Sequence, residues 1–102
     1  MIISTTENIG KDYEVLGVVK GGTVQTVNVM RDLGASLKTI VGGELTKYNE
    51  MMDSARKIAT ERMIQEAQAL GADAVVGMRY SSASIMQSAA EIMAYGTAVR
   101  FV

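Results

Sequence analysis

The 102-residue sequence contains no cysteine, histidine, tryptophan or proline. Without cysteine there is no disulfide framework, iron–sulfur cluster, thiolate nucleophile or Cys-based zinc finger. Without histidine, the commonest general base and the commonest imidazole metal ligand are missing as well. The serines have no histidine to activate them. We therefore expect no catalytic residues, and a protein that is not an enzyme.

Neither sign of charge is in large excess, because ten Lys and Arg residues are balanced by eleven Asp and Glu residues, for a net charge of −1. No basic stripe and only 5% aromatic residues argue against nucleic-acid binding. No apolar run approaches the roughly 20 residues that span a bilayer. The first residues lack the basic and apolar regions of a signal peptide. These features predict one cytoplasmic domain over residues 1–102 with no membrane partner.

What is present is 48% hydrophobic residues, arranged in strand and helix patterns. Strand patterns occupy residues 1–6, 13–19, 23–29, 72–80 and 90–101. The pair Gly21-Gly22 either forms a tight hairpin turn or bends one long strand through a bulge, and the pair itself favours neither. The small polar residues 81–88 predict a hairpin loop. The predicted class is α+β, with an antiparallel sheet covered by helix on one face.

Two helices are predicted, a short one over residues 31–41 and a long one over 44–70. In the long helix, apolar residues recur in steps of three and four, and Gly71 is a natural stop. The members of this stripe are Leu45, Tyr48, Met52, Ala55, Ala59, Met63, Ala67 and Leu70.

The last predicted strand is apolar on both faces, and one helix layer covers only one face of a sheet. Residues 13–19 have the same two-sided pattern, and Ile64 lies among charges on the long helix. Three apolar surfaces without an internal partner predict a homo-oligomer. The residues expected at the subunit interface are Ile64, Met93, Tyr95, Val99 and Phe101.

Charged residues suggest one candidate pocket. Glu66 falls inside the predicted apolar stripe, and Arg62 and Arg56 flank it. The trio is either a pocket with a tuned carboxylate or an intersubunit or snorkelling salt bridge, and the second is favoured. Tyr95, with Tyr13 and Tyr80, either stacks a planar ligand at an interface or simply packs.

No metal ligands are predicted, and the cofactor is left unknown. The eight methionines fit core positions better than a Cu(I) site. The helical carboxylates Glu50, Asp53 and Glu61 alternate with lysines and fit a solvated face better than a cation site.

Several segments, in order along the chain, resemble the YbjQ-like family of small uncharacterised bacterial proteins. They are IISTTE at 2–7, VLGVV at 15–19, RDL at 31–33, LGADAVVG at 70–77 and AYGTAV at 94–99. The resemblance implies a β-α-β-β core similar to dodecin-type subunits, assembled into a homopentameric ring, either alone or as two rings paired into a decamer. It also favours a bent strand pair at Gly21-Gly22.

The family carries a heavy-metal-binding label, which fits this chain poorly because a heavy-metal site normally uses thiolate or imidazole. The leading hypothesis is a non-enzymatic homo-oligomer that binds a metal or small ligand at or near its subunit interfaces. The alternative is a scaffolding homo-oligomer with no ligand. A third hypothesis is an enzyme that uses Glu66 with Arg62 or Arg56.

Overall fold

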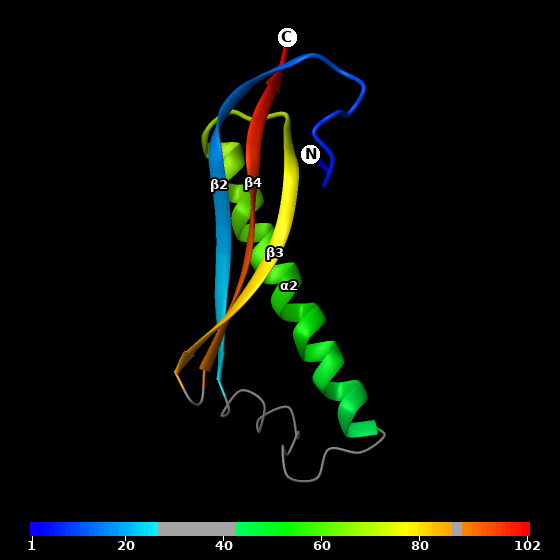
Figure 1. Ribbon diagram of the computed structural model, residues 1–102, viewed down its shortest axis with the longest axis vertical. Helices are drawn as coiled ribbons and strands as arrows, with labels where there is room; N and C mark the ends of the chain where they lie inside the picture. The colour runs from blue at the N-terminus through cyan, green and yellow to red at the C-terminus, as the bar shows by residue number, and fades with distance from the viewer. Residues whose placement is uncertain (27–42, 87–88) are drawn as a thin grey trace.

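The computed structural model describes residues 1–26, 43–86 and 89–102. The elements are β1 (Ile2–Ile3), β2 (Tyr13–Thr26), α2 (Gly43–Ala69), β3 (Ala74–Met86) and β4 (Ala89–Phe101). The strands form one sheet in the order β1-β3-β4-β2, and α2 lies across one face of it (Figure 1). The α+β class is confirmed. The helix predicted over 31–41, and residues 27–29, lie outside the described residues.

The sheet is mixed, which corrects the predicted antiparallel sheet. β4 pairs antiparallel with both β2 and β3, but β1 pairs parallel with β3, with Ile2 opposite Ala74. Hydrogen bonds extend this contact, because Ser4 N donates to Val75 O and Met78 N donates to Ser4 O. The parallel strand β1 is short and lies far from β3 in the sequence, so local sequence patterns do not reveal that the two strands pair.

The Gly21-Gly22 pair lies within β2, which is one long strand paired with β4 throughout. The hairpin alternative is therefore wrong. The register shift that bends β2 falls between Val15 and Gly17, not at the glycine pair. Gly21 has a different role, because it is buried where α2 crosses β2. A Cβ placed there would lie 2.7 Å from the carbonyl carbon of Arg62 and closer still to other α2 backbone atoms.

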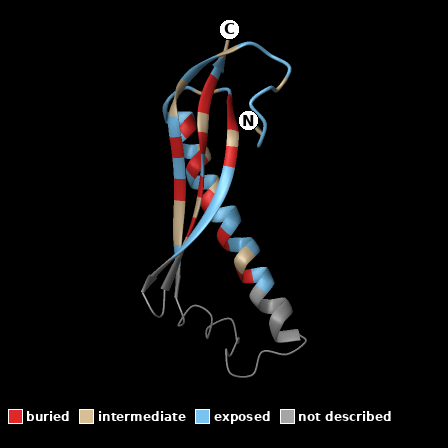
Figure 2. Ribbon diagram, viewed as in Figure 1, coloured by how far each residue is buried: buried red, intermediate tan, exposed pale blue. Residues whose placement is uncertain are grey.

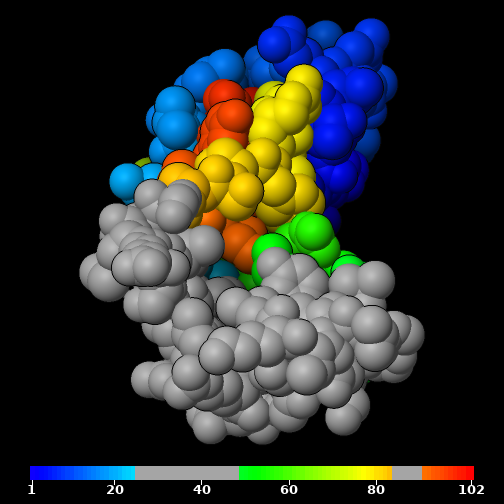
Figure 3. Space-filling view, turned by 60° about the horizontal axis from the view of Figure 1, so that its bottom comes forward, coloured from blue at the N-terminus to red at the C-terminus, as the bar shows by residue number. Residues whose placement is uncertain are grey.

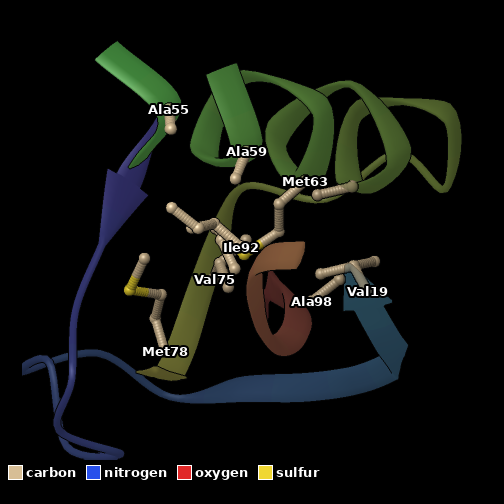
Figure 4. Close-up of a cluster of buried hydrophobic side chains, with 10 residues drawn as sticks. Val19, Ala55, Ala59, Met63, Val75, Met78, Ile92 and Ala98 are labelled. Carbon is tan, nitrogen blue, oxygen red and sulfur yellow. The ribbon is translucent and has the colours of Figure 1, made fainter. Parts of the chain in front are cut away.

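The main core lies between α2 and the sheet. The buried residues of α2 follow strict steps of four, and they are Met51, Ala55, Ala59, Met63 and Ala67. The last four of these pack with residues from all three long strands, among them Val19, Val75 and Ile92 (Figure 4). Figure 2 shows the buried residues following the helix face that meets the strands. Small alanines on the helix and Gly21 on β2 let the two backbones approach closely.

The long helix ends as its sequence predicts, within one residue. Gly71 has φ of 78°, the left-handed conformation that glycine adopts without a Cβ clash. Gly71 N donates to Gln68 O at 3.0 Å, and Ala72 N donates to Ala67 O at 3.1 Å. These two bonds form a Schellman motif, which satisfies carbonyls that have no partner inside the helix.

The predicted hairpin loop over 81–88 is wrong over most of its length, because β3 continues to Met86. Ser81 pairs with Met93, and Ser82 pairs with Ile92. Small polar residues are weak strand formers, but pairing with a neighbouring strand outweighs this local preference.

Candidate functional site

The face of the sheet turned away from α2 carries apolar side chains that are exposed to solvent. Side chains alternate along β2: Val19 packs beneath α2, whereas its neighbour Val18 is directed to the opposite face. Val18 is 75% exposed, and Val15 is 65% exposed. We call this surface the open face. Its exposed or partly exposed members are Val15, Val18, Lys20 and Val24 of β2 and Met93, Tyr95 and Thr97 of β4.

One part of this side of the sheet is covered by the chain itself. Ala74, Val76 and Val99 form a second buried cluster beneath Ile9, Tyr13 and Phe101. The Tyr13 hydroxyl donates to the Glu7 carbonyl at 2.7 Å and helps to hold the N-terminal segment in place. Val99 is fully buried here, so it offers no surface to another subunit and leaves the expected interface set. Phe101 is partly buried in the same cluster.

The three charged side chains named as pocket candidates, Glu66, Arg62 and Arg56, do not come together. Arg56 Nη1 donates to Asp53 Oδ1 at 2.8 Å, and Arg62 Nη1 donates to the carbonyl oxygen of Gly22 at 2.5 Å. Glu66 is exposed, and within the described ranges it forms no ion pair with either arginine.

Glu66 does not lie inside the buried stripe of α2, where the sequence predicts it. The reason is that this stripe winds around the helix and does not run parallel to its axis. The buried residues follow steps of four, which turn about 40° further around the helix at each step. At 100° per residue, Glu66 lies about 80° from the midpoint between Met63 and Ala67. Ile64 lies a similar angle away on the other side and is partly buried.

Tyr95 is also separated from the helical charges. It is opposite Lys20 in the register with β2 and opposite Arg79 in the register with β3, on the open face. Arg56, Arg62 and Glu66 belong to α2, which covers the other face. Tyr95 is 37% exposed, so it remains a candidate for subunit contact but not for a pocket with the helical charges.

A cleft does exist on the α2 side, and we call it the helix–hairpin cleft. It has a volume of about 220 Å³ and lies between α2 and the distal half of the β3–β4 hairpin. It is lined by Met52, Arg56, Tyr80, Ser81, Ser82 and Ile92. Figure 3 shows atoms of α2 (green) reaching the surface beside those of β3 (yellow). Arg56 lines this cleft together with Tyr80, Ser81 and Ser82, and Glu66 does not line it.

The Tyr80 side chain is held by the helix. Its hydroxyl lies 2.8 Å from Thr60 Oγ1, and Thr60 Oγ1 also donates to the Arg56 carbonyl at 2.7 Å. Because Thr60 has a single hydroxyl hydrogen, Tyr80 is the donor of the bond between them. Thr60 gives no motif signal in the sequence, and only the fold brings it to Tyr80.

The residues fit a heavy-metal site poorly. The full sequence has no thiolate or imidazole ligand, and the described residues hold no group of three carboxylates that could bind an ion. Met63 and Met78 are buried in the core cluster, where their thioethers fill space.

No described helix is long and apolar enough to cross a membrane.

The fold and surfaces define a class: an α+β chain with one long helix on a mixed sheet, and with exposed apolar side chains on the other side. The chain belongs to the YbjQ family, described as "Putative heavy-metal-binding", whose profile matches residues 1–102.

Relatives agree with this family. A UPF0145 protein of Clostridium novyi (strain NT) is 53% identical, with 100% of each chain covered. One from Thermotoga maritima is 55% identical over 98% of this chain and 96% of its own. Neither has an enzyme name. The fold is similar to a crystal structure from Pediococcus pentosaceus, a protein of unknown function of the DUF74 family. Its TM-score is 0.72 at 20% identity, covering 100% of this chain and 98% of that one.

Proposed function

We propose that the protein is a non-enzymatic, cytoplasmic homo-oligomer that binds a small ligand, with the open face of each subunit covered by a second copy of the chain. The observation that carries this proposal is the exposure of the Val18 and Val15 side chains on the open face of the sheet. Burying valine side chains of this kind contributes about 1.5–3 kcal/mol each. A contiguous apolar patch is a common mark of a protein interface.

The extended shape of the single chain supports a second copy of the chain as the partner that covers the open face. Its radius of gyration is 16.4 Å, and its extents are 53 × 25 × 17 Å. A compact chain of this length has a radius near 13 Å. Its accessible surface is 6512 Å², whereas a monomer of this mass typically exposes about 5,600 Å². A subunit of an assembly can be this extended because its neighbours complete the burial.

The sheet edges support a ring. β2 is an edge strand of 14 residues, and the short β1 covers only the first residues of β3 on the other edge. Long uncovered edges favour pairing with another chain. Because the two edges differ, pairing of one edge with the other is head-to-tail, and head-to-tail contacts form a ring when the rotation between subunits closes. We propose a homopentameric ring, with two rings pairing into a decamer.

Light scattering after size-exclusion chromatography at micromolar concentration tests the assembly. We expect a mass five or ten times 10.9 kDa. Val18→Lys places a charge on the open face and should lower the mass. Val102→Lys makes the same change at a valine that is 80% exposed but outside the open face, and it should leave the mass unchanged. A stable 10.9 kDa monomer, or equal effects of the two variants, contradicts the proposal.

A further inference from the structure

We propose that the helix–hairpin cleft binds a small organic anion, a carboxylate carried on a compact apolar body. This inference deepens the ligand-binding half of the proposed function and rests on it. It follows from the charge, the walls and the size of the cleft.

The only charged side chain among the six described lining residues is Arg56, and it is positive. A guanidinium presents five N–H donors in a planar fork that matches a carboxylate. One Arg56 nitrogen, Nη1, donates to Asp53 Oδ1. Asp53 does not line the cleft and is 73% exposed, so this pair is weakened by solvent and leaves donors for a ligand.

The apolar walls are already in place. Ile92 is 3% exposed and belongs to the core cluster, and Met52 packs against that cluster. Tyr80 contributes its ring, because its hydroxyl hydrogen is used in the bond to Thr60. An apolar ligand body would therefore rest on Met52, Ile92 and the Tyr80 ring, while the carboxylate meets Arg56 and the hydroxyl of Ser82, which lies on the same face as Ile92. A bare inorganic anion would leave these apolar walls unused.

The size of the cleft further limits which ligands it can hold. The cleft volume of about 220 Å³ is below the roughly 300–1,000 Å³ typical of pockets for drug-sized molecules. A dinucleotide or a flavin is too large. A single-ring or short branched carboxylic acid fits, and benzoate is a suitable probe.

The test is an NMR titration of the assembled protein, in which the methyl groups of isoleucine and methionine are isotopically labelled. Benzoate should shift the Ile92 and Met52 methyl signals saturably, and benzamide, which lacks the charge, and acetate, which lacks the ring, should bind at least tenfold more weakly. Arg56→Gln should weaken benzoate binding roughly tenfold to hundredfold, the range of a hydrogen bond to a charged group. Lys57→Gln removes the same charge from the next, exposed position and should change nothing.

Three outcomes would overturn the inference: no shift at Ile92 with benzoate on the order of millimolar, equal binding of benzamide, or equal affinities of the Arg56 and Lys57 variants. Light scattering and native mass spectrometry on the same samples keep the two proposals apart. An intact oligomer that retains another small-molecule mass but ignores benzoate overturns only the ligand class. A monomer that binds benzoate through Arg56 overturns only the assembly.

Discussion

Gly21 of β2 lies directly against the backbone of Ala59 in α2, with no room for a side chain between them. A Cβ at Gly21 would overlap the Ala59 carbonyl oxygen and the Met63 amide nitrogen. These are backbone atoms inside a helix, so they cannot move aside as a flexible side chain can. The contact sets how closely the helix approaches the sheet.

Gly21→Ala should therefore lower the free energy of unfolding by about 1–3 kcal/mol, the usual cost of overpacking. Gly22→Ala is the matched control, because a Cβ there would meet its nearest atom at 3.6 Å. Its unfolding free energy should change by less than about 0.5 kcal/mol. Urea denaturation measures both. Similar losses in the two variants would mean that the close approach at Gly21 does not limit packing.

Met63 is the largest fully buried side chain of the core. Met63→Ala should cost about 2–5 kcal/mol of unfolding free energy, because it removes apolar burial and leaves a cavity. Gln65→Ala, at an exposed position of the same helix, should stay within about 0.5 kcal/mol of the parent. Chemical denaturation followed by circular dichroism separates them, and a mild Met63→Ala variant would argue against the described core.

Gly71 adopts a left-handed conformation at the end of α2. Gly71→Ala should cost about 1–2 kcal/mol, because a Cβ is strained there. Gly71→Asn should cost less, since asparagine tolerates this conformation better. Thermal unfolding ranks the three proteins. If alanine were as stable as asparagine, backbone strain at Gly71 would not be the cause.

Metal binding should be weak. With no Cys or His, and no cluster of three carboxylates among the described residues, Zn²⁺ or Cd²⁺ lacks the ligands of a tight site. We expect no stoichiometric metal after dialysis by elemental analysis, and no rise in Tm on adding one equivalent of Zn²⁺. One retained metal per subunit would contradict this and would favour the description that the family carries.

The elements with strong local signals could be predicted from the sequence. The long helix was placed to within one residue at each end, because its period and its glycine stop are local. The parallel β1 could not be predicted, because it pairs with residues far away in the sequence. The extension of β3 through Ser81 and Ser82 could not be predicted either, because pairing with β4 outweighs the weak strand preference of these residues. The same limit applies to Val99, which looks like an interface residue until Ile9 and Tyr13 cover it.

The candidate site was predicted only in part. Arg56 lies beside a cleft but Glu66 does not, because the four-residue step of the buried stripe becomes visible only with the sheet in place. The bond between Tyr80 and Thr60 joins a strand to a helix and has no sequence motif. The ring and its interface residues remain predictions.

The pairing of β2 with β4 also has a consequence for how the chain folds. Tyr13 pairs with Phe101, so the first long strand meets the last one. Such distant pairings close large loops of chain and slow folding. The β3–β4 hairpin is local and is expected to form early, whereas among the described strands β2 pairs with β4 alone and must wait until β4 has been synthesised. A nascent chain therefore holds the long, apolar β2 without its β4 partner while the residues between them are added, and this is a period of exposure to aggregation.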